Sequence, residues 1–159
     1  MKSQYLSHIE EAYQGEVYGE AMYNAIADKM DDPDHAHKWR VLAQMEKETK
    51  AHIRELVKRL GGDVIESETE RQKGIQEADK YASMPWIELM KTFSEELDVD
   101  IEAYSKLEKD CPPEDAAALR RLTEHEVLTK EFCDMEVAGN SDESILGIIA
   151  FCETPPVKK

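Results

Sequence analysis

The sequence predicts an all-α protein of one domain: four long helices in a bundle, with a long crossover between the second and third and a short fifth helix near the C-terminus. Three observations predict this. Apolar residues recur at helical spacing in four long blocks. The seven glycines and six prolines are clustered rather than scattered and leave long uninterrupted stretches. The 159 residues suffice for one domain with a sizeable core and are too few for two.

The first two predicted helices form a hairpin over residues 5–60. The first helix covers residues 5–30, and the Asp-Asp-Pro run at 31–33 ends it. The second covers residues 34–60 and stops at Gly61-Gly62, because glycine readily takes the left-handed conformation that closes a helix. We therefore expect two antiparallel helices of similar length.

The second predicted hairpin covers residues 84–137, and Cys-Pro-Pro at 111–113 separates its two helices. The two hairpins are joined by a polar crossover at 61–83, which has room for a minor helix. Helix–helix turns in bundles are usually about 2–8 residues, so a connection this long predicts a crossover along the bundle. An apolar, capped segment at 141–153 predicts the short fifth helix.

The two hairpins match each other at a constant offset of 80 residues without gaps. Nine of the 35 positions from 16 to 50 are identical to their partners, where composition alone would give about two or three. The matches include the turn prolines, Pro33 and Pro113. Any two amphipathic helices resemble each other to some degree, but an ungapped register that also aligns the prolines favours an internal repeat.

Each predicted helix carries a glutamate where its apolar seam calls for a core residue: Glu16, Glu46, Glu96 and Glu126. In the third helix that seam runs through Val99. The midpoint of each pair falls at its hairpin turn, so each hairpin brings two carboxylates side by side. The repeat then brings all four toward one layer of the bundle.

Four ionised carboxylates inside a bundle would repel one another and lose hydration, at several kcal/mol per ion. Protons or cations must therefore neutralise them. Two divalent ions balance four negative charges, and carboxylate oxygens suit hard or borderline metals such as Fe, Mn or Mg. The alternative is that some seams face outward, so that their glutamates are hydrated, or that arginines pair with them.

These residues resemble the ferritin-like di-iron carboxylate proteins, the group of rubrerythrin, bacterioferritin and ferritin. Gly15-Glu16 followed by Tyr23 is similar to the group's first-helix pattern, and Glu-Leu-Asp at 96–98 is similar to its third helix. The resemblance covers residues 5–137. It implies a ferritin-like bundle of up-down-down-up helices with a pair of Fe or Mn ions at its middle. By position, the ligands would be Glu16, Glu46, Glu96 and Glu126.

The chain departs from the group at its most specific motif. Glu-x-x-His on the second and fourth helices is here Glu-x-x-Thr, with Thr49 and Thr129 in place of both histidines. Threonine is a poor ligand for Fe(II), which weakens the expected redox activity. Glu20 and Asp100, one turn from Glu16 and Glu96, are second-tier candidate ligands. We expect the five histidines to be ordinary surface or flank residues: His8, His35, His37, His52 and His125.

Two functions remain open at this stage. The first is a metal-binding protein, with redox chemistry on dioxygen or peroxide implied by the resemblance. The second is a degenerate bundle without metal that acts as a scaffold or small-molecule-binding protein, its carboxylates protonated or hydrated. Iron storage in a cage would need a large symmetric assembly, on which a single sequence is silent.

The charge balance limits the classes of partner, and the first residues of the chain bear on its location. Acids outnumber bases 35 to 20, for a net charge of −15, which disfavours binding to nucleic acid or to an anionic membrane surface. The first residues lack the apolar core of a signal peptide, so we expect the protein in the cytoplasm. The three cysteines form no C-x-x-C pair. An exposed apolar fifth helix would favour a homodimer.

Overall fold

The computed structural model describes residues 1–156, and its secondary structure over that range is entirely helical, which confirms the predicted all-α class. Its helices are α1 (Gln4–Lys29), α2 (Pro33–Arg59), α3 (Glu68–Ala82), α4 (Trp86–Asp110), α5 (Ala116–Val137) and α6 (Leu146–Phe151), with a 3₁₀ turn at Pro113–Asp115. The four long helices lie where the sequence predicts them. The crossover helix α3 has 15 residues and is more than the minor helix expected there, whereas α6 is shorter than the predicted 141–153.

The ends of α2 show how local sequence sets the helix boundaries. At its start, the Asp32 carboxylate accepts a hydrogen bond from the Asp34 amide at 2.8 Å, and Pro33 occupies the first turn. At its end, Gly61 has φ of +79°, and the Gly62 amide donates to the Val57 carbonyl at 2.9 Å. This is the hydrogen-bond pattern of a glycine-terminated helix, so the break predicted at Gly61-Gly62 is confirmed.

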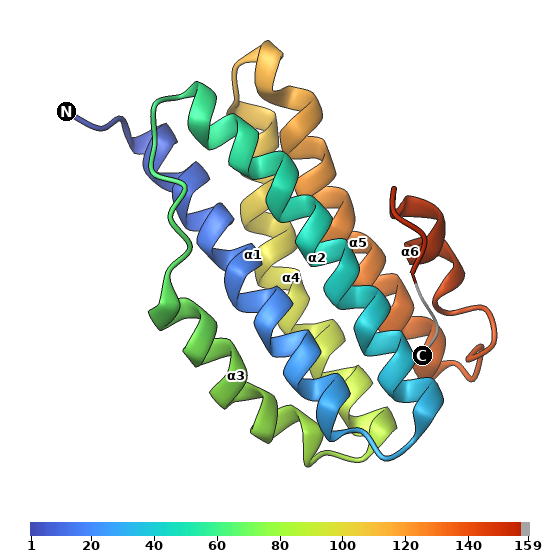
Figure 1. Ribbon diagram of the computed structural model, residues 1–159. Coiled ribbons are helices and arrows are strands. Elements are labelled where there is room, and N and C mark those ends of the chain that lie inside the picture. Colours follow the sequence, from blue (N-terminus) through green and yellow to red (C-terminus); the bar gives the residue numbers. More distant parts are fainter. Residues whose placement is uncertain (157–159) are drawn as a thin grey trace.

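The four long helices run lengthwise beside one another (Figure 1). In that view α1 descends, α2 ascends, α4 ascends and α5 descends, so each hairpin is antiparallel while α2 and α4 run in the same direction. The segment from 60 to 85 makes this order possible, because it returns the chain along the bundle before α4 begins. This segment runs first as extended, non-helical chain and then as helix α3.

Helix α3 packs directly on α1, although most of its residues are polar. Gly74 makes the close approach possible, since a Cβ at this position would overlap the backbone carbonyl of Tyr18. Ala78 and Tyr81, four and seven residues later, are buried on the same face. Two of the three buried residues of α3, Gly74 and Ala78, are small and give a weak hydropathy signal in the sequence.

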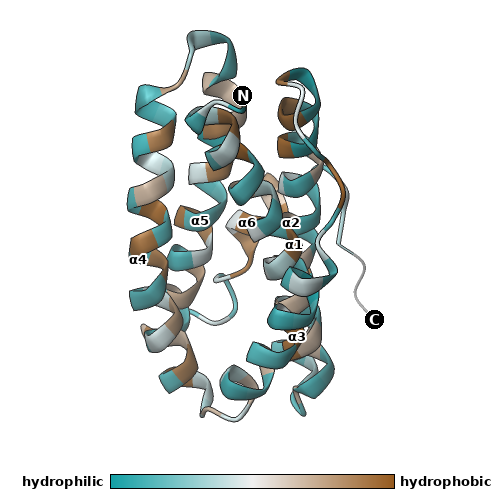
Figure 2. Cartoon of the chain, turned by 90° about the vertical axis from the view of Figure 1, so that its left-hand side faces the viewer, coloured by the Kyte–Doolittle hydropathy of each residue, from teal (hydrophilic) through white to brown (hydrophobic). Residues whose placement is uncertain are grey.

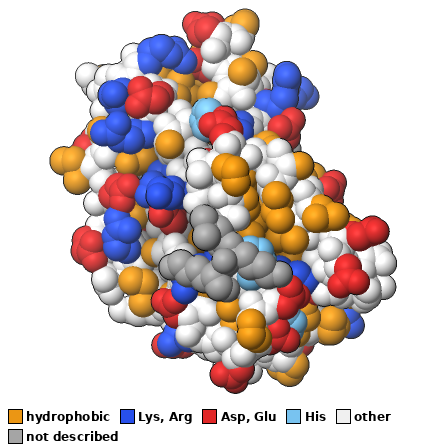
Figure 3. Space-filling view, turned by 45° about the vertical axis from the view of Figure 1, so that its right-hand side comes forward, with side chains coloured by type: hydrophobic (Ala, Val, Ile, Leu, Met, Phe, Trp, Pro, Cys, Tyr) orange, Lys and Arg blue, Asp and Glu red, His pale blue; other side chains and the backbone are white. Residues whose placement is uncertain are grey.

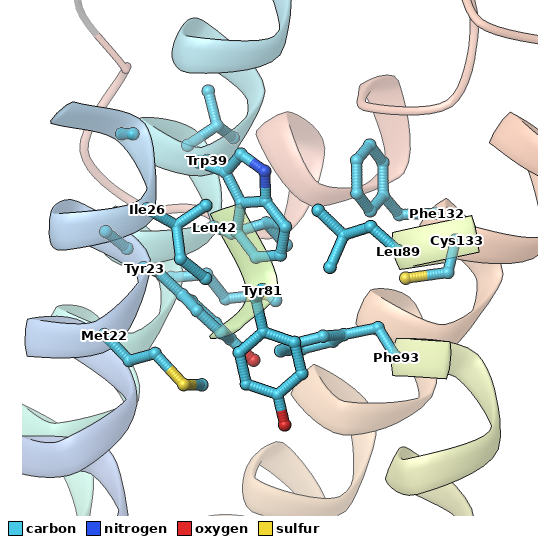
Figure 4. Packing of buried hydrophobic residues seen from close by; sticks show 14 of the residues in the cluster. Met22, Tyr23, Ile26, Trp39, Leu42, Tyr81, Leu89, Phe93, Phe132 and Cys133 are labelled. Carbon is cyan, nitrogen blue, oxygen red and sulfur yellow. The ribbon is translucent and has the colours of Figure 1, made fainter. Parts of the chain in front are cut away.

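Apolar side chains form two core clusters at different levels of the bundle, and Figure 2 shows apolar and polar stretches alternating along the helices. One cluster contains Ile9 of α1, Ile53 of α2 and Leu119 of α5. The other is rich in aromatic side chains: the rings of Tyr23 and Phe93 lie 5.7 Å apart between centroids (Figure 4). The chain between the two clusters contributes the polar residues of the candidate site.

Helix α6 is folded onto its own bundle, against α2 and α5. Ile145 and Ile148 are buried there, whereas Leu146 is 56% exposed. On the face shown in Figure 3, acidic and basic side chains are interspersed with apolar ones. Because the chain itself covers the two isoleucines, less apolar surface of this segment is exposed than the expectation of a dimer assumed. The dimer stays a prediction.

No helix within residues 1–156 combines the length and the apolar character needed to span a membrane.

Candidate metal centre

Four ionisable side chains from three helices meet between the two apolar cores. Glu16 comes from α1, Glu46 from α2, and His125 and Glu126 from α5. All four are buried, with exposed fractions from 0% for His125 to 8% for Glu126. We call these four residues the buried cluster. Three of the four predicted glutamates thus lie together, and a histidine completes the set.

The imidazole of His125 is the centre of the buried cluster. Its Nε2 lies 3.1 Å from Glu16 Oε1, and 3.3 Å from an oxygen of each of Glu46 and Glu126. On the other side of the ring, Nδ1 donates a hydrogen bond to the Leu122 carbonyl. A carbonyl oxygen accepts but never donates, so this bond places a proton on Nδ1. In the neutral ring Nε2 then offers a lone pair toward the carboxylates, which is how metal-binding histidines are commonly oriented.

Each side chain of the buried cluster has one polar atom without a hydrogen-bond partner. Glu16 Oε2, Glu46 Oε1, Glu126 Oε2 and His125 Nε2 are all buried without a hydrogen-bond partner. An unpaired buried polar group costs about 1–3 kcal/mol, and more if it is charged. Such atoms can be satisfied by a retained proton, by protonated His125 or by a bound cation.

The spacing of the carboxylate oxygens around His125 Nε2 fits one metal ion. At metal–ligand bonds of about 2.1 Å, neighbouring ligand atoms are about 3.0–3.4 Å apart in octahedral or tetrahedral geometry. The N–O separations of 3.1 and 3.3 Å around His125 match this range. One ligand atom each from Glu16, His125 and Glu126 lies within 4.8 Å of the others. The donor set therefore fits a divalent cation.

The electrostatics of the metal-free cluster favour retained protons. Burial raises the pKa of Glu126 to about 8, against an opposing effect of His125. Burial also raises the pKa of Glu46, and the negative charge of Glu16 raises it further. For His125, burial acts to lower the pKa, but the three neighbouring carboxylates outweigh it and raise the pKa well above 6.5. Without a cation, the cluster binds protons more tightly than the same groups in water.

A glycine on α1 makes room for the Glu46 carboxylate. An ideal Cβ on Gly19 would lie 2.5 Å from Glu46 Oε2, so any larger residue here would displace the carboxylate. Gly19 follows Glu16 by three residues and shares its face of α1. The same face therefore supplies one carboxylate and the space for another.

The two threonines at the expected histidine positions are buried but make different contacts. Thr129 Oγ1 donates to the backbone carbonyl of His125 at 2.8 Å, so its hydroxyl is bound within its own helix. Thr49 Oγ1 is buried without a hydrogen-bond partner. The imidazole of the site comes instead from His125, one residue before Glu126.

The expectation that His125 is a surface or flank residue is wrong, since its side chain is fully buried. A signal for it was present in the sequence. Leu122, His125, Glu126 and Thr129 occupy positions i, i+3, i+4 and i+7, which is one complete face of a helix. A core stripe of this width includes both His125 and Glu126, although the two differ by about 100° around the helix axis.

Glu96 does not join the buried cluster. Its side chain is 45% exposed, accepts a hydrogen bond from the Tyr81 hydroxyl at 2.5 Å and lies 3.5 Å from Lys80 Nζ. The seam expected for this helix is wrong, because Val99 is 72% exposed. The observed seam of α4 passes through Phe93 and Leu97, whose larger apolar area decides the rotation of the helix.

The two second-tier candidates also lie outside the buried cluster. Glu20 is bound by Lys50, whose Nζ lies 2.5 Å from its Oε2 and 2.8 Å from Glu66 Oε1. Asp100 lines a pocket next to the cluster. Loss of solvent raises the pKa of Asp100, and the negative charge of Glu46 raises it further, so Asp100 is electrostatically coupled to the site.

Two tyrosines enclose the site. The ring of Tyr104 on α4 lies 6.4 Å from the His125 ring, between centroids. Tyr23 on α1 packs against Trp39 in the aromatic core, as Figure 4 shows. Burial and the nearby carboxylates raise the pKa of both tyrosines well above 10. Both therefore remain protonated phenols, which supply apolar surface and hydroxyl groups rather than charge.

No protein-family model matches the chain, and no curated protein and no solved structure shows a significant match to it.

Proposed function

We propose that the protein binds a divalent metal ion, Fe(II) or Mn(II), in the buried cluster, and that it is a metal-binding bundle of the ferritin-like type. The observation that carries this proposal is the convergence of three buried carboxylates, those of Glu16, Glu46 and Glu126, on Nε2 of the buried His125 at 3.1–3.3 Å. The direction of the four long helices and the crossover between α2 and α4 support the ferritin-like assignment.

Charge and geometry favour one ion in this arrangement. Three carboxylates and a neutral imidazole carry a charge of −3, and one divalent cation reduces it to −1. A second ion would need further ligands, and the fourth predicted ligand, Glu96, is held outside by Tyr81 and Lys80. Three oxygen donors and one nitrogen donor suit Fe(II) and Mn(II) better than metals that prefer thiolates.

The protein's own groups prepare the site for a cation. The hydrogen bond to Leu122 orients the imidazole, and Gly19 leaves space for the Glu46 carboxylate. Surrounding apolar side chains exclude bulk water, which strengthens charge interactions inside. A bound Fe or Mn ion would supply redox chemistry with dioxygen or peroxide. Glu46, Glu126 and His125, whose pKa values are raised without a cation, would release the protons that they retain when the cation binds.

Metal analysis of the protein purified without chelators tests the proposal. We expect near-stoichiometric Fe or Mn in the wild type and its loss in the double variant Glu46→Gln plus Glu126→Gln. The matched control, Glu124→Gln plus Glu131→Gln, changes two exposed glutamates on α5 and should retain the metal. Absence of bound metal after anaerobic incubation with Fe(II) or Mn(II), together with an unchanged melting temperature, would overturn the proposal.

A specific observation also favours the second candidate, a bundle that works without metal as a scaffold or small-molecule-binding protein. The pKa of Glu126 is raised to about 8, so at neutral pH a proton can neutralise this carboxylate. The same metal analysis separates the two candidates, because a cluster neutralised by protons alone gains no stability from added Fe(II) or Mn(II).

A further inference from the structure

A pocket of about 240 Å³ leads to the buried cluster from one side. It lies between α1, α3 and α4, and Figure 2 shows α3 and α4 on that side of the molecule. Glu46 and Glu126 line it, and both are more than nine-tenths buried. Glu96 and Asp100, both on α4 and both exposed, line it as well. The pocket thus joins the exposed surface of α4 to two members of the cluster.

The two inner carboxylates indicate what the pocket accommodates. Glu46 Oε1 and Glu126 Oε2 are buried without a hydrogen-bond partner, so the inner end of the pocket presents carboxyl oxygens that a cation can bind when it displaces their protons. A pocket with charges of one sign and apolar walls focuses the electric field and concentrates ions of the opposite charge. Tyr23 and Phe93 supply such walls here.

The two outer carboxylates differ in their partners. Glu96 is held by the Tyr81 hydroxyl and by Lys80, which fixes it to α3 and offsets its charge. Asp100 has no ion-pair partner within residues 1–156. The charge of Glu46 raises the pKa of Asp100, and the charge of Asp100 in turn raises the pKa of Glu126. Asp100 is therefore the outer residue whose negative charge acts on the inner end of the pocket.

We propose that this pocket is the route by which a divalent cation reaches the buried cluster, and that Asp100 draws the cation into it from solvent. This inference rests on the metal-binding function proposed above. Asp100 serves here as a positioning residue for the incoming ion and is not a ligand in the final site. The carboxyl groups of Asp100, Glu46 and Glu126, which all line the pocket, mark the path.

The rate of Co²⁺ uptake tests the route separately from the final affinity. Metal-free protein is mixed with Co²⁺ in a stopped-flow instrument, and the visible absorption of bound Co²⁺ is followed. We expect Asp100→Asn to slow uptake about three- to tenfold at low ionic strength, and Asp100→Lys to slow it further. The final number of Co²⁺ ions per chain should not change. The difference from wild type should shrink in 0.5 M NaCl, where charges are screened over about 4 Å.

Glu95→Gln and Glu95→Lys are the matched controls, since Glu95 is an exposed acid on α4 that does not line the pocket. They should take up Co²⁺ at the wild-type rate. Wild-type rates in both Asp100 variants would overturn the route. Unchanged uptake with faster release or a lower stoichiometry would make Asp100 a ligand, which also overturns it. A wild type that binds no Co²⁺ at all would refute the proposed function itself.

Discussion

Replacing Glu126 by glutamine should make the metal-free protein more stable, and increasingly so as the pH rises. Burial raises the pKa of this carboxyl from its usual 4.5 to about 8, so the folded state retains a proton that the unfolded state has lost. Between these two pH values the folded state binds more protons, and its stability therefore falls as the pH increases. The raised pKa of His125 acts in the same direction above pH 6.5.

The size of the effect follows from the two pKa values. One pKa unit corresponds to about 1.4 kcal/mol, so ionised Glu126 destabilises the folded state by about 5 kcal/mol well above pH 8. At pH 7, where most of the folded protein keeps the proton, the cost is about 3 kcal/mol. At pH 5 it is about 1 kcal/mol. The stability difference between Glu126→Gln and wild type should therefore grow by about 4 kcal/mol from pH 5 to pH 9.

Urea unfolding of chelator-treated protein, followed by circular dichroism at intervals from pH 5 to pH 9, measures this difference. Glu124→Gln removes an exposed charge from the same helix and should follow the wild type at every pH. If the stability of Glu126→Gln stayed parallel to the wild type within about 1 kcal/mol across the range, the carboxyl would not be buried among like charges. The account of the cluster would then be wrong.

Three further outcomes follow from the same structure. Gly19→Ala places a Cβ 2.5 Å from Glu46 Oε2 and should lower Co²⁺ affinity at least tenfold in a spectroscopic titration, whereas Gly15→Ala, with more space, should bind like wild type. Lys38→Met leaves the buried Glu136, 2.5 Å from Lys38 Nζ, without its cation and should cost about 3 kcal/mol in urea unfolding; a loss under 1 kcal/mol would contradict this. Metal binding at pH 7 should release about one to two protons, measured by calorimetry in buffers of different ionisation enthalpy; heats independent of the buffer would speak against it.

The helices and their order could be predicted from the sequence because strong local signals mark them. Pro33 and Gly61 bound α2, and apolar periodicity identifies the long helices. The crossover helix was predicted less well. Its packing face relies on Gly74 and Ala78, which bury little apolar area and so leave little trace in a hydropathy pattern.

The candidate site was predictable where the helix rotation was unambiguous. Each of Glu16, Glu46 and Glu126 has an apolar residue four positions before it and another seven positions after it, so their places on the buried face follow from periodicity. Helix α4 offers two competing stripes, and the one through Phe93 and Leu97 buries more apolar surface than the one that would bury Glu96. Only the packing of α4 in the whole bundle decides between them.

His125 was missed for a different reason. Helical spacing gives the direction of a Cβ atom, whereas the place of a long side chain also depends on its rotamer and on the space around it. The His125 ring reaches the carboxylates because Nδ1 bonds back to the Leu122 carbonyl and the neighbouring positions leave room. The internal repeat gave no help, since the partner of His125 at the offset of 80 is the apolar Met45.

The central claim is that the buried cluster holds a divalent metal ion. Anomalous X-ray diffraction from crystals grown with Mn²⁺ tests it most directly, because the anomalous signal locates the ion independently of the protein atoms. We predict one strong peak per chain inside the buried cluster, bound by Glu16, Glu46, His125 and Glu126 at about 2.0–2.3 Å. The claim would be contradicted by Mn²⁺ peaks confined to surface carboxylates, with no peak inside the cluster.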